Sequence, residues 1–313
     1  MRLVTFPGQG SPVLTQVLKK YIAQRSPAIL ASKDARLAMG LMERSPADPA
    51  SIAACSFLLY QLLPADKTNQ VFLGHSLGEL SCLAAGNRLF SLTQTMQVAT
   101  YRNKLMIEAA GGQEYGLWAL SAPKALDLAR DVKRLLPAAT TGTSLALANV
   151  NTLQQCVVTG SPADFAPWES ELRRHIGRCR IKSLENPYGI PFHNHHVLAK
   201  IREPLLDFMW QNLKSQGTNT QDKLDYPIIS NLTGQLVCAV PEALENFARS
   251  SCNVVEFVKC CESVNLLNLH EAINVGPGAV ISKLVIKNCH TISNNLEWNE
   301  YMGDAQTSSI KAE

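Results

Sequence analysis

Hydrophobic residues along the chain occur as short continuous runs, separated by longer segments with helical spacing. The runs at 2–6 and 71–73 each end at a glycine-containing turn, which is typical of buried strands that lead into a helix. Further strands are expected at 226–231 and just before the glycine loop at 275–278. Recurrence of apolar residues every three or four positions predicts helices over 13–25, 50–63, 92–110, 197–214 and 241–264.

The elements become short and separated between about 113 and 187. Their expected order is strand, helix, strand, strand, helix, strand, over 116–120, 123–136, 144–150, 155–160, 162–176 and 178–184. This order is the split βαβ arrangement of a ferredoxin-like domain. We therefore predict an α/β protein with an inserted small ferredoxin-like α+β domain at 113–187. The large α/β-hydrolase-like domain, with a parallel sheet, would comprise 1–112 and 188–313.

The amino-acid composition excludes several classes of protein but does not indicate a particular function. A chain of 313 residues that is 46% hydrophobic can bury the core of a globular protein. Its formal net charge of +3 is not gathered into basic runs, so we expect no nucleic-acid binding. The apolar run at 52–63 is too short to cross a bilayer, and we expect no stable membrane association. Nine scattered cysteines without a C-x-x-C pair favour a reducing compartment over a disulfide framework or a zinc ribbon.

A candidate nucleophile lies in the segment Gly74-His75-Ser76-Leu77-Gly78, which fits the pattern G-x-S-x-G. In such an elbow, small residues two before and two after the serine let a strand and a helix pack around a strained turn. The backbone N–H of Leu77 would then point to where a carbonyl oxygen acquires negative charge. The alternative is an ordinary turn between a strand and a helix.

A glycine-rich loop at 7–11 follows the first strand and contains Gln9. At the carboxyl edge of a parallel sheet this loop can bring the Gln9 amide beside the nucleophile, where it could donate to an oxyanion. The alternative is that Gln9 is simply a polar turn residue.

Arg102 lies at the edge of an apolar helical stripe and has no acidic residue three or four positions away. Its guanidinium must therefore find an anion elsewhere, or reach solvent by extending along the surface. In the first case it could bind a substrate carboxylate through two hydrogen bonds.

Three histidines follow a proline-rich and glycine-containing linker: His193, His195 and His196. Their spacing matches no common zinc pattern and no cysteine lies nearby, so we expect no metal. A catalytic base requires only one histidine. Spacing alone does not choose among these three and the remaining histidines, His75, His175, His270 and His290.

Six motifs in order resemble the malonyl-CoA:acyl carrier protein transacylase family. They are Phe6-Pro7-Gly8-Gln9-Gly10-Ser11, Gly74-His75-Ser76-Leu77-Gly78-Glu79, Arg102 with Leu105-Met106, Asn149-Val150-Asn151, Pro191-Phe192-His193 and Val275-Gly276-Pro277-Gly278. The resemblance spans most of the chain and includes the inserted ferredoxin-like unit. The segments around 55–56, 74–82 and 186–194 are similar to the fungal mitochondrial branch.

The resemblance implies a role for each candidate residue. Ser76 would be the nucleophile and His193 the base. Gln9 and the N–H of Leu77 would form the oxyanion hole, and Arg102 would bind the malonyl carboxylate. The predicted reaction is transfer of malonyl from malonyl-CoA to the phosphopantetheine thiol of acyl carrier protein, which supplies fatty-acid synthesis.

The chain departs from the bacterial pattern of this family at the residue that orients the histidine. There, a glutamine before an N-P-V segment contributes its main-chain carbonyl; here Asn253-Val254-Val255 assigns that role to Ser250. The resemblance further implies no bound cofactor and no metal. Malonyl-CoA and phosphopantetheinylated acyl carrier protein would be substrates of a monomer, in the mitochondrial matrix or, for a bacterial protein, in the cytoplasm. Residues 1–6 already have the pattern of a strand, so we expect any targeting segment to be either absent or already removed, and the protein not to be secreted.

Two other functions also fit parts of the pattern. A serine hydrolase could use Ser76 with Asp164 or Glu185 and then His193 or His270, an order known for α/β-hydrolases. A hydrolase of neutral esters would give Arg102 no purpose. The third hypothesis is a carrier-protein-binding module without catalysis. The presence of all four candidate residues argues against it: Gln9, Ser76, Arg102 and His193.

Overall fold

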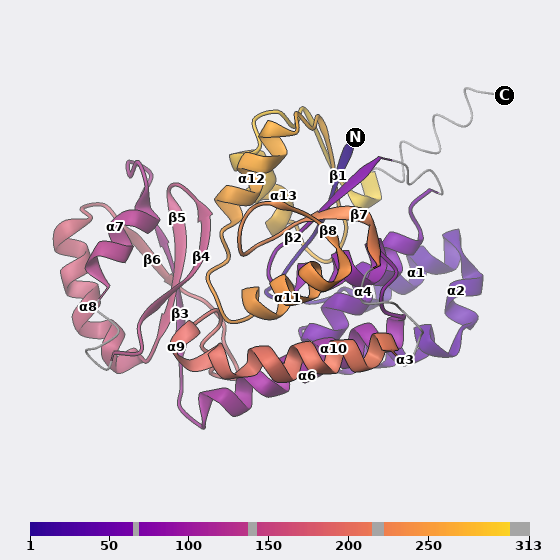
Figure 1. Ribbon diagram of the computed structural model, residues 1–313, viewed down its shortest axis with the longest axis horizontal. Coiled ribbons are helices and arrows are strands. Elements are labelled where there is room, and N and C mark those ends of the chain that lie inside the picture. The colour runs from indigo at the N-terminus through magenta and orange to yellow at the C-terminus, as the bar shows by residue number, and fades with distance from the viewer. Residues whose placement is uncertain (65–68, 137–142, 215–221, 301–313) are drawn as a thin grey trace.

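The computed structural model describes residues 1–64, 69–136, 143–214 and 222–300, and contains two sheets (Figure 1). The larger sheet has six strands in the order β10-β9-β1-β2-β7-β8. These are β1 (Arg2–Phe6), β2 (Gln70–Gly74), β7 (Lys223–Ile229), β8 (Leu236–Ala239), β9 (Glu271–Asn274) and β10 (Asn294–Glu297). Every neighbouring pair is parallel except β7 and β8. The predicted α/β class with a parallel sheet is confirmed.

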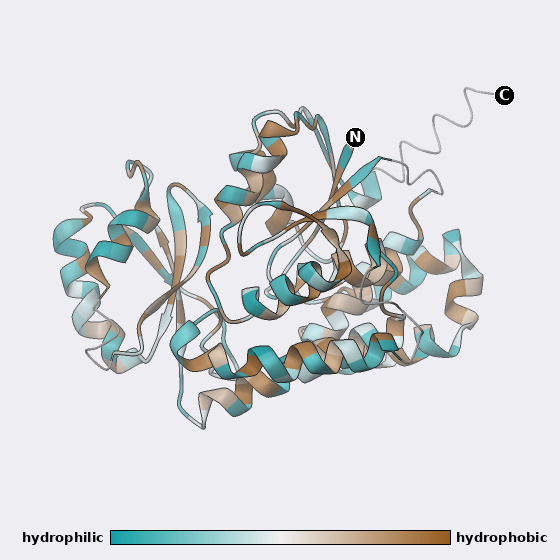
Figure 2. Ribbon diagram, viewed as in Figure 1, coloured by the Kyte–Doolittle hydropathy of each residue, from teal (hydrophilic) through white to brown (hydrophobic). Residues whose placement is uncertain are grey.

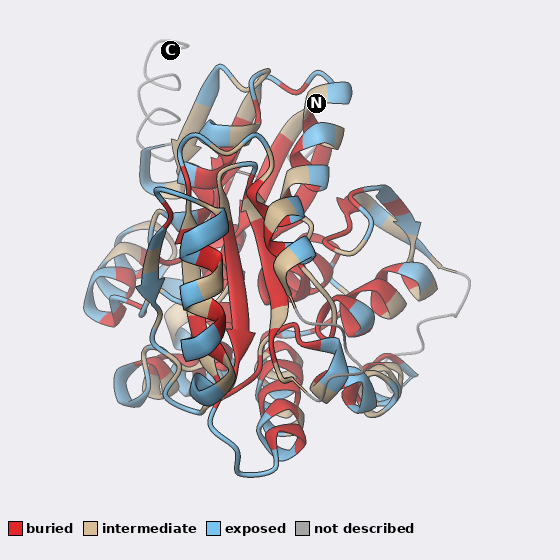
Figure 3. Ribbon diagram, turned by 90° about the vertical axis from the view of Figure 1, so that its left-hand side faces the viewer, coloured by how far each residue is buried: buried red, intermediate tan, exposed pale blue. Residues whose placement is uncertain are grey.

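The two central strands place the glycine loops that follow them. β1 and β2 are buried almost throughout, as strands covered on both faces should be (Figure 3). Their register pairs Phe6 with Gly74, so both strands end at the same level. The backbone N–H of His75 then donates to the carbonyl of Phe6 over 3.0 Å. The loop that carries Gln9 and the turn that carries Ser76 therefore leave the sheet side by side.

Helices cover both faces of this sheet. They are α1 (Thr15–Arg25), α2 (Pro27–Ala31), α3 (Lys33–Arg44), α4 (Pro49–Gln61), α5 (Gly78–Ser81), α6 (Leu92–Ala110), α9 (His195–Leu198), α10 (Arg202–Lys214), α11 (Val240–Ser250), α12 (Phe257–Leu266) and α13 (Val280–Asn288). α4 lies in the core and is buried nearly all round, whereas α10 alternates hydrophilic and hydrophobic turns at the surface (Figure 2). Within the described ranges, no helix combines the length and apolar character that a bilayer span requires.

The second sheet belongs to a smaller unit beside the first (Figure 1). It is formed by β3 (Gly116–Ser121), β4 (Ala146–Thr152), β5 (Gln155–Gly160) and β6 (Arg180–Ser183), with α7 (Leu128–Leu135) and α8 (Pro162–His175). The order β4-β5-β3-β6 with antiparallel neighbours is that of a ferredoxin-like sheet. It has its own apolar core, in which Trp118 stacks on Phe165.

The predicted helix over 241–264 is wrong, because the segment divides into α11 and α12. Between them Val255 pairs with Asn149 as an isolated parallel bridge. The N–H of Val150 donates to the carbonyl of Val255, and the N–H of Val255 donates to that of Ala148, each over 2.9 Å. Pairing with a strand of the small domain thus outweighs local helical spacing.

Other differences concern shorter segments. The helix expected from 123 begins at Leu128, where the Asp127 side chain accepts from the N–H of Arg130. The residue pattern predicted none of α2, α3, β8 and β10. The capping box at Ser91 is confirmed, with Gln94 as its partner, and α6 ends at Gly111 in the left-handed region. Residues 301–313 of the predicted large domain lie outside the described residues.

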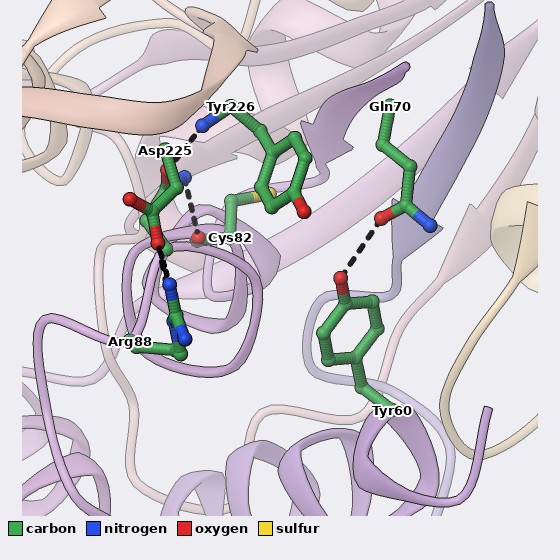
Figure 4. A network of polar contacts seen from close by, with 7 residues as sticks. Tyr60, Gln70, Cys82, Arg88, Asp225 and Tyr226 are labelled. Carbon is green, nitrogen blue, oxygen red and sulfur yellow. Dashed lines mark hydrogen bonds and ion pairs between the residues drawn. The ribbon is translucent and has the colours of Figure 1, made fainter. Parts of the chain in front are cut away.

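A polar network joins the end of the elbow helix to β7 (Figure 4). α5 continues into a π-helical turn, Cys82–Gly86, whose first carbonyl accepts from the Asn87 side chain. The oxygen of that side chain accepts from the N–H of Tyr226 over 2.8 Å. Arg88 and Asp225 form an exposed ion pair next to it. β7 is thereby held against the segment that follows Ser76.

Candidate active site

The turn at Ser76 is strained and closely packed. Ser76 has φ +53°, a left-handed conformation that is uncommon for a residue with a side chain. A Cβ on Gly78 would lie 2.2 Å from the backbone oxygen of Phe6, and one on Gly74 would lie 2.1 Å from the N of Glu79. Only glycine fits at these two positions, so the G-x-S-x-G pattern forms an elbow and not an ordinary turn.

Asn231, two residues after the end of β7, holds the elbow by three hydrogen bonds. Its side-chain oxygen accepts from the N–H of Ser76 over 2.7 Å, and its amide donates to the carbonyl of Gly74 over 2.6 Å. Its own N–H donates to Oε1 of Glu79 over 2.8 Å. Asn231 is fully buried. The residue pattern gave no indication that Asn231 belongs to the site beyond an asparagine at the end of a predicted strand.

His193 lies next to the serine, with Nε2 2.8 Å from Ser76 Oγ. Its Nδ1 lies 2.7 Å from the carbonyl of Ser250 and 3.0 Å from that of Asn253. Since carbonyls only accept, Nδ1 carries the proton and Nε2 is free to accept one from the serine hydroxyl. The structure thus brings together Ser76, His193 and the Ser250 carbonyl; it adds the Asn253 carbonyl, which the sequence did not reveal.

The surroundings keep His193 neutral. The side chain is 3% exposed. Burial, with the positive charge of Arg102 as a second cause, lowers the pKa of His193 to about 3. The imidazole is therefore in the form that can accept a proton at neutral pH.

No carboxylate completes a Ser–acid–His triad among the described residues. Asp164 accepts hydrogen bonds from Ser144 in the small domain, and Nδ1 of His270 lies against the carbonyl of Thr291. Because Nδ1 of His193 faces two backbone carbonyls, neither Asp164 nor Glu185 takes the acid position of a triad with Ser76 and His193.

The other histidines near the site do not form a metal centre. His195 and His196 are exposed. In the part of the chain that the structure describes, no three His, Cys, Asp or Glu side chains are grouped in a way that could hold a metal ion. His75 lies 3.0 Å, at Nε2, from the side-chain oxygen of Asn151, and so links the elbow to β4 of the small domain.

Arg102 is 1% exposed, so the alternative in which its head reaches solvent is wrong. Nε donates to Ser251 Oγ over 2.8 Å, and Nη2 lies 3.4 Å from Ser76 Oγ. The guanidinium also lies 5.8 Å from the centre of the Phe247 ring. Burial lowers the pKa of Arg102 to about 10, which still leaves it cationic at neutral pH. Across the described ranges no carboxylate lies within ion-pair distance of it, and the charge of Glu79 acts on it only from farther away, so the positive charge beside the nucleophile has no direct ion-pair partner.

Gln9 and Leu77 border the same space. The side-chain oxygen of Gln9 lies 3.5 Å from Nη1 of Arg102, which leaves the Gln9 amide N–H groups for another acceptor. The backbone N–H of Leu77 precedes the first turn of α5, and the described residues offer it no acceptor. Two donors beside Ser76 are therefore available for an oxyanion.

Glu79 is a buried acid that the sequence analysis did not assign to the site. Its Oε1 accepts from Asn231 and its Oε2 accepts from Ser250 Oγ over 2.5 Å. Burial raises the pKa of Glu79 to about 7, against the opposing effect of these hydrogen bonds and of Arg102. Glu79 thus connects the elbow to the segment that orients His193.

The sequence is similar to those of transacylases from yeast and bacteria. No protein-family model matches the sequence. The mitochondrial malonyl CoA-acyl carrier protein transacylase of Saccharomyces cerevisiae is 36% identical, over 92% of this chain and 93% of the relative. The malonyl CoA-acyl carrier protein transacylase of Bacillus subtilis is 27% identical, over 77% of this chain and 71% of the relative.

Solved structures support the fold. The malonyl-CoA:acyl carrier protein transacylase of Helicobacter pylori aligns with a TM-score of 0.75 at 20% identity, over 97% of each chain. A malonyl-transacylase in complex with its type II polyketide synthase acyl-carrier protein aligns with a TM-score of 0.73 at 19% identity, over 93% of this chain and 94% of that one.

Proposed function

The chain belongs to the malonyl CoA-acyl carrier protein transacylase family, and we propose that it transfers malonyl from malonyl-CoA to the phosphopantetheine thiol of acyl carrier protein. Such a reaction supplies fatty-acid synthesis. The observation that carries this proposal for the residues of this chain is that Nε2 of His193 and Nη2 of the buried Arg102 both lie within hydrogen-bond reach of Ser76 Oγ.

In the first half-reaction His193 Nε2 takes the proton from Ser76 as the serine oxygen attacks the thioester carbonyl. The oxyanion of the tetrahedral intermediate accepts from the Leu77 N–H and from the Gln9 amide. When the carbon–sulfur bond breaks, the CoA thiolate takes the proton from His193. Malonyl is left as an ester on Ser76.

In the second half-reaction the thiol of acyl carrier protein gives its proton to the neutral His193. The thiolate attacks the malonyl-serine ester through a second tetrahedral intermediate in the same oxyanion hole. Collapse of the intermediate returns the proton from His193 to Ser76. Burial of Ser76, which is 9% exposed, limits the access of water to the ester between the two steps.

Arg102 selects the acyl group. Its Nε is occupied by Ser251, whereas Nη1 and Nη2 face Gln9 and Ser76. A carboxylate one carbon beyond the reacting carbonyl can accept from both terminal amino groups. An acetyl group offers no such partner and leaves the buried cation uncompensated.

The test is intact-mass analysis after incubation with malonyl-CoA or acetyl-CoA. We expect a malonyl adduct on the wild-type protein, its absence in Ser76→Ala, and little acetyl adduct. Addition of phosphopantetheinylated acyl carrier protein should remove the adduct and load the carrier. A wild-type protein without an adduct, or one that releases malonate faster than it loads the carrier, would overturn the proposal.

We further propose that the enzyme needs no bound cofactor and acts as a monomer in the mitochondrial matrix. The mitochondrial Saccharomyces cerevisiae relative supports this compartment. Size-exclusion chromatography with light scattering tests the monomer, and imaging of the tagged protein tests the compartment.

A further inference from the structure

Two adjacent serines lie at the C-terminal end of α11: Ser250 is its last residue and Ser251 follows it. Ser250 and Ser251 are each 1% exposed. Ser250 offers its carbonyl to His193 and its hydroxyl to Glu79, whereas Ser251 offers its hydroxyl to Arg102. Consecutive residues therefore contact different parts of the site: Ser250 contacts His193 through its carbonyl and Glu79 through its hydroxyl, and Ser251 contacts Arg102.

The hydroxyl of Ser250 has two acceptors within reach and one proton to donate. Its Oγ lies 2.5 Å from Glu79 Oε2 and 3.1 Å from the carbonyl of Phe247. When Glu79 is ionised, the hydroxyl donates to the carboxylate. When Glu79 is protonated, the acid can donate to Ser250 Oγ, which then donates to Phe247. Ser250 remains hydrogen-bonded in both states, so the carbonyl that orients His193 keeps its place.

The hydroxyl of Ser251 is used differently. It accepts from Arg102 Nε and donates to the carbonyl of Phe247 over 2.9 Å. This contact fixes the rotation of the planar guanidinium, because Nε is part of the plane. The two terminal amino groups are then the ones presented to a substrate carboxylate.

We propose that the hydroxyls of Ser250 and Ser251 are positioning groups with separable duties: Ser250 acts through Glu79 and its own carbonyl on proton transfer by His193, and Ser251 acts through Arg102 on recognition of the acyl carboxylate. This inference rests on the proposed function. The inference extends the proposed function, because it links catalysis and acyl-group selectivity to two neighbouring hydroxyls at the end of α11.

The experiment compares Ser250→Ala with Ser251→Ala in steady-state malonyl transfer to acyl carrier protein. Ser251→Ala should raise KM for malonyl-CoA about tenfold with kcat changed less than about threefold, the effect of one lost hydrogen bond to a charged group. Ser250→Ala should lower kcat about tenfold with KM changed less than about threefold. Ser51→Ala is the matched control, since Ser51 is a fully buried serine whose hydroxyl has no hydrogen-bond partner among the described residues.

Double-mutant cycles separate positioning from general destabilisation. In an Arg102→Ala background, Ser251→Ala should change KM by less than about twofold; in a Glu79→Gln background, Ser250→Ala should lower kcat by less than it does in the wild type. Additive effects, or the same KM and kcat pattern in both single variants, would overturn the inference. If an alanine variant unfolds, Ser→Cys at the same position keeps the volume, weakens the hydrogen bond and serves the same comparison. Failure of the wild type to form malonyl-Ser76 would instead overturn the proposed function.

Discussion

The two halves of the active site are built in different ways. The nucleophile half consists of Ser76 and its glycines, where β2 turns into α5 against the end of β1. The base half consists of His193, Arg102 and the end of α11. The first half depends on close backbone packing where β1 and β2 end side by side, held by the side chain of Asn231. The second depends on carbonyls and hydroxyls from segments that are distant in the sequence.

The two halves are also held in place by different parts of the molecule. The carbonyls that hold His193 lie on the break between α11 and α12, and that break exists because Val255 pairs with the small domain. The elbow is held within the large domain, mainly by Asn231. Glu79 is the side chain that joins the halves, since it accepts from Asn231 on one side and Ser250 on the other.

Removing the cation from the base half should have the largest effect on activity. For Arg102→Ala we expect kcat/KM for malonyl transfer to fall, because the substrate carboxylate loses its partner. The fall corresponds to a loss of about 2 to 5 kcal/mol in transition-state stabilisation. Steady-state kinetics with malonyl-CoA and acetyl-CoA measures it. An unchanged preference for malonyl would show that Arg102 does not bind the carboxylate.

Filling the tight packing of the elbow should chiefly reduce stability. In Gly78→Ala the new methyl group meets the backbone oxygen of Phe6, and we expect a loss of about 3 kcal/mol in the free energy of unfolding. Denaturant titration measures it. The control is Gly177→Ala, where a Cβ meets nothing within 4 Å. Equal stability of the two variants would contradict the packing argument.

The acid that joins the halves should make stability depend on pH. The pKa of Glu79 is raised to about 7 from 4.5, so the folded protein binds this proton more tightly than the unfolded chain does. The contribution of the protonated acid to the free energy of unfolding is therefore fully present below pH 4.5 and is lost as pH rises through 7. Glu79→Gln imitates the protonated acid, so its free energy of unfolding relative to wild type should rise by about 2 kcal/mol between pH 5 and 8. A constant difference from urea titrations over this range would refute the raised pKa.

The smallest effect is expected from titration of the base itself. With a pKa of about 3, His193 stays neutral down to mildly acidic pH. In the Glu79→Gln variant, which removes the other titration, kcat/KM for malonyl-CoA should vary by less than about twofold between pH 5.5 and 7.5. An acid limb with a midpoint near 6.5 would show that His193 is not desolvated as the structure indicates.

Several features followed from neighbouring residues alone. The glycine spacing of the G-x-S-x-G motif, the capping box at Ser91 and the order of strands and helices along the small domain are all visible as local patterns in the sequence. Such patterns can be recognised along the chain because they depend on residue types at short, fixed spacings. The fold class and the candidate serine were accessible in this way.

The chemistry around that serine was decided by tertiary structure. Helical spacing over 241–264 predicted one helix, and only pairing of Val255 with Asn149 broke it and exposed the carbonyls that orient His193. The direction of Arg102, left open between solvent and site, was set by Ser251, which is 149 positions away. Asn231 and Glu79, which contact each other in the site, are 152 positions apart in the sequence. Such contacts depend on where the sheet and the inserted domain place each segment, which no local pattern of residues encodes.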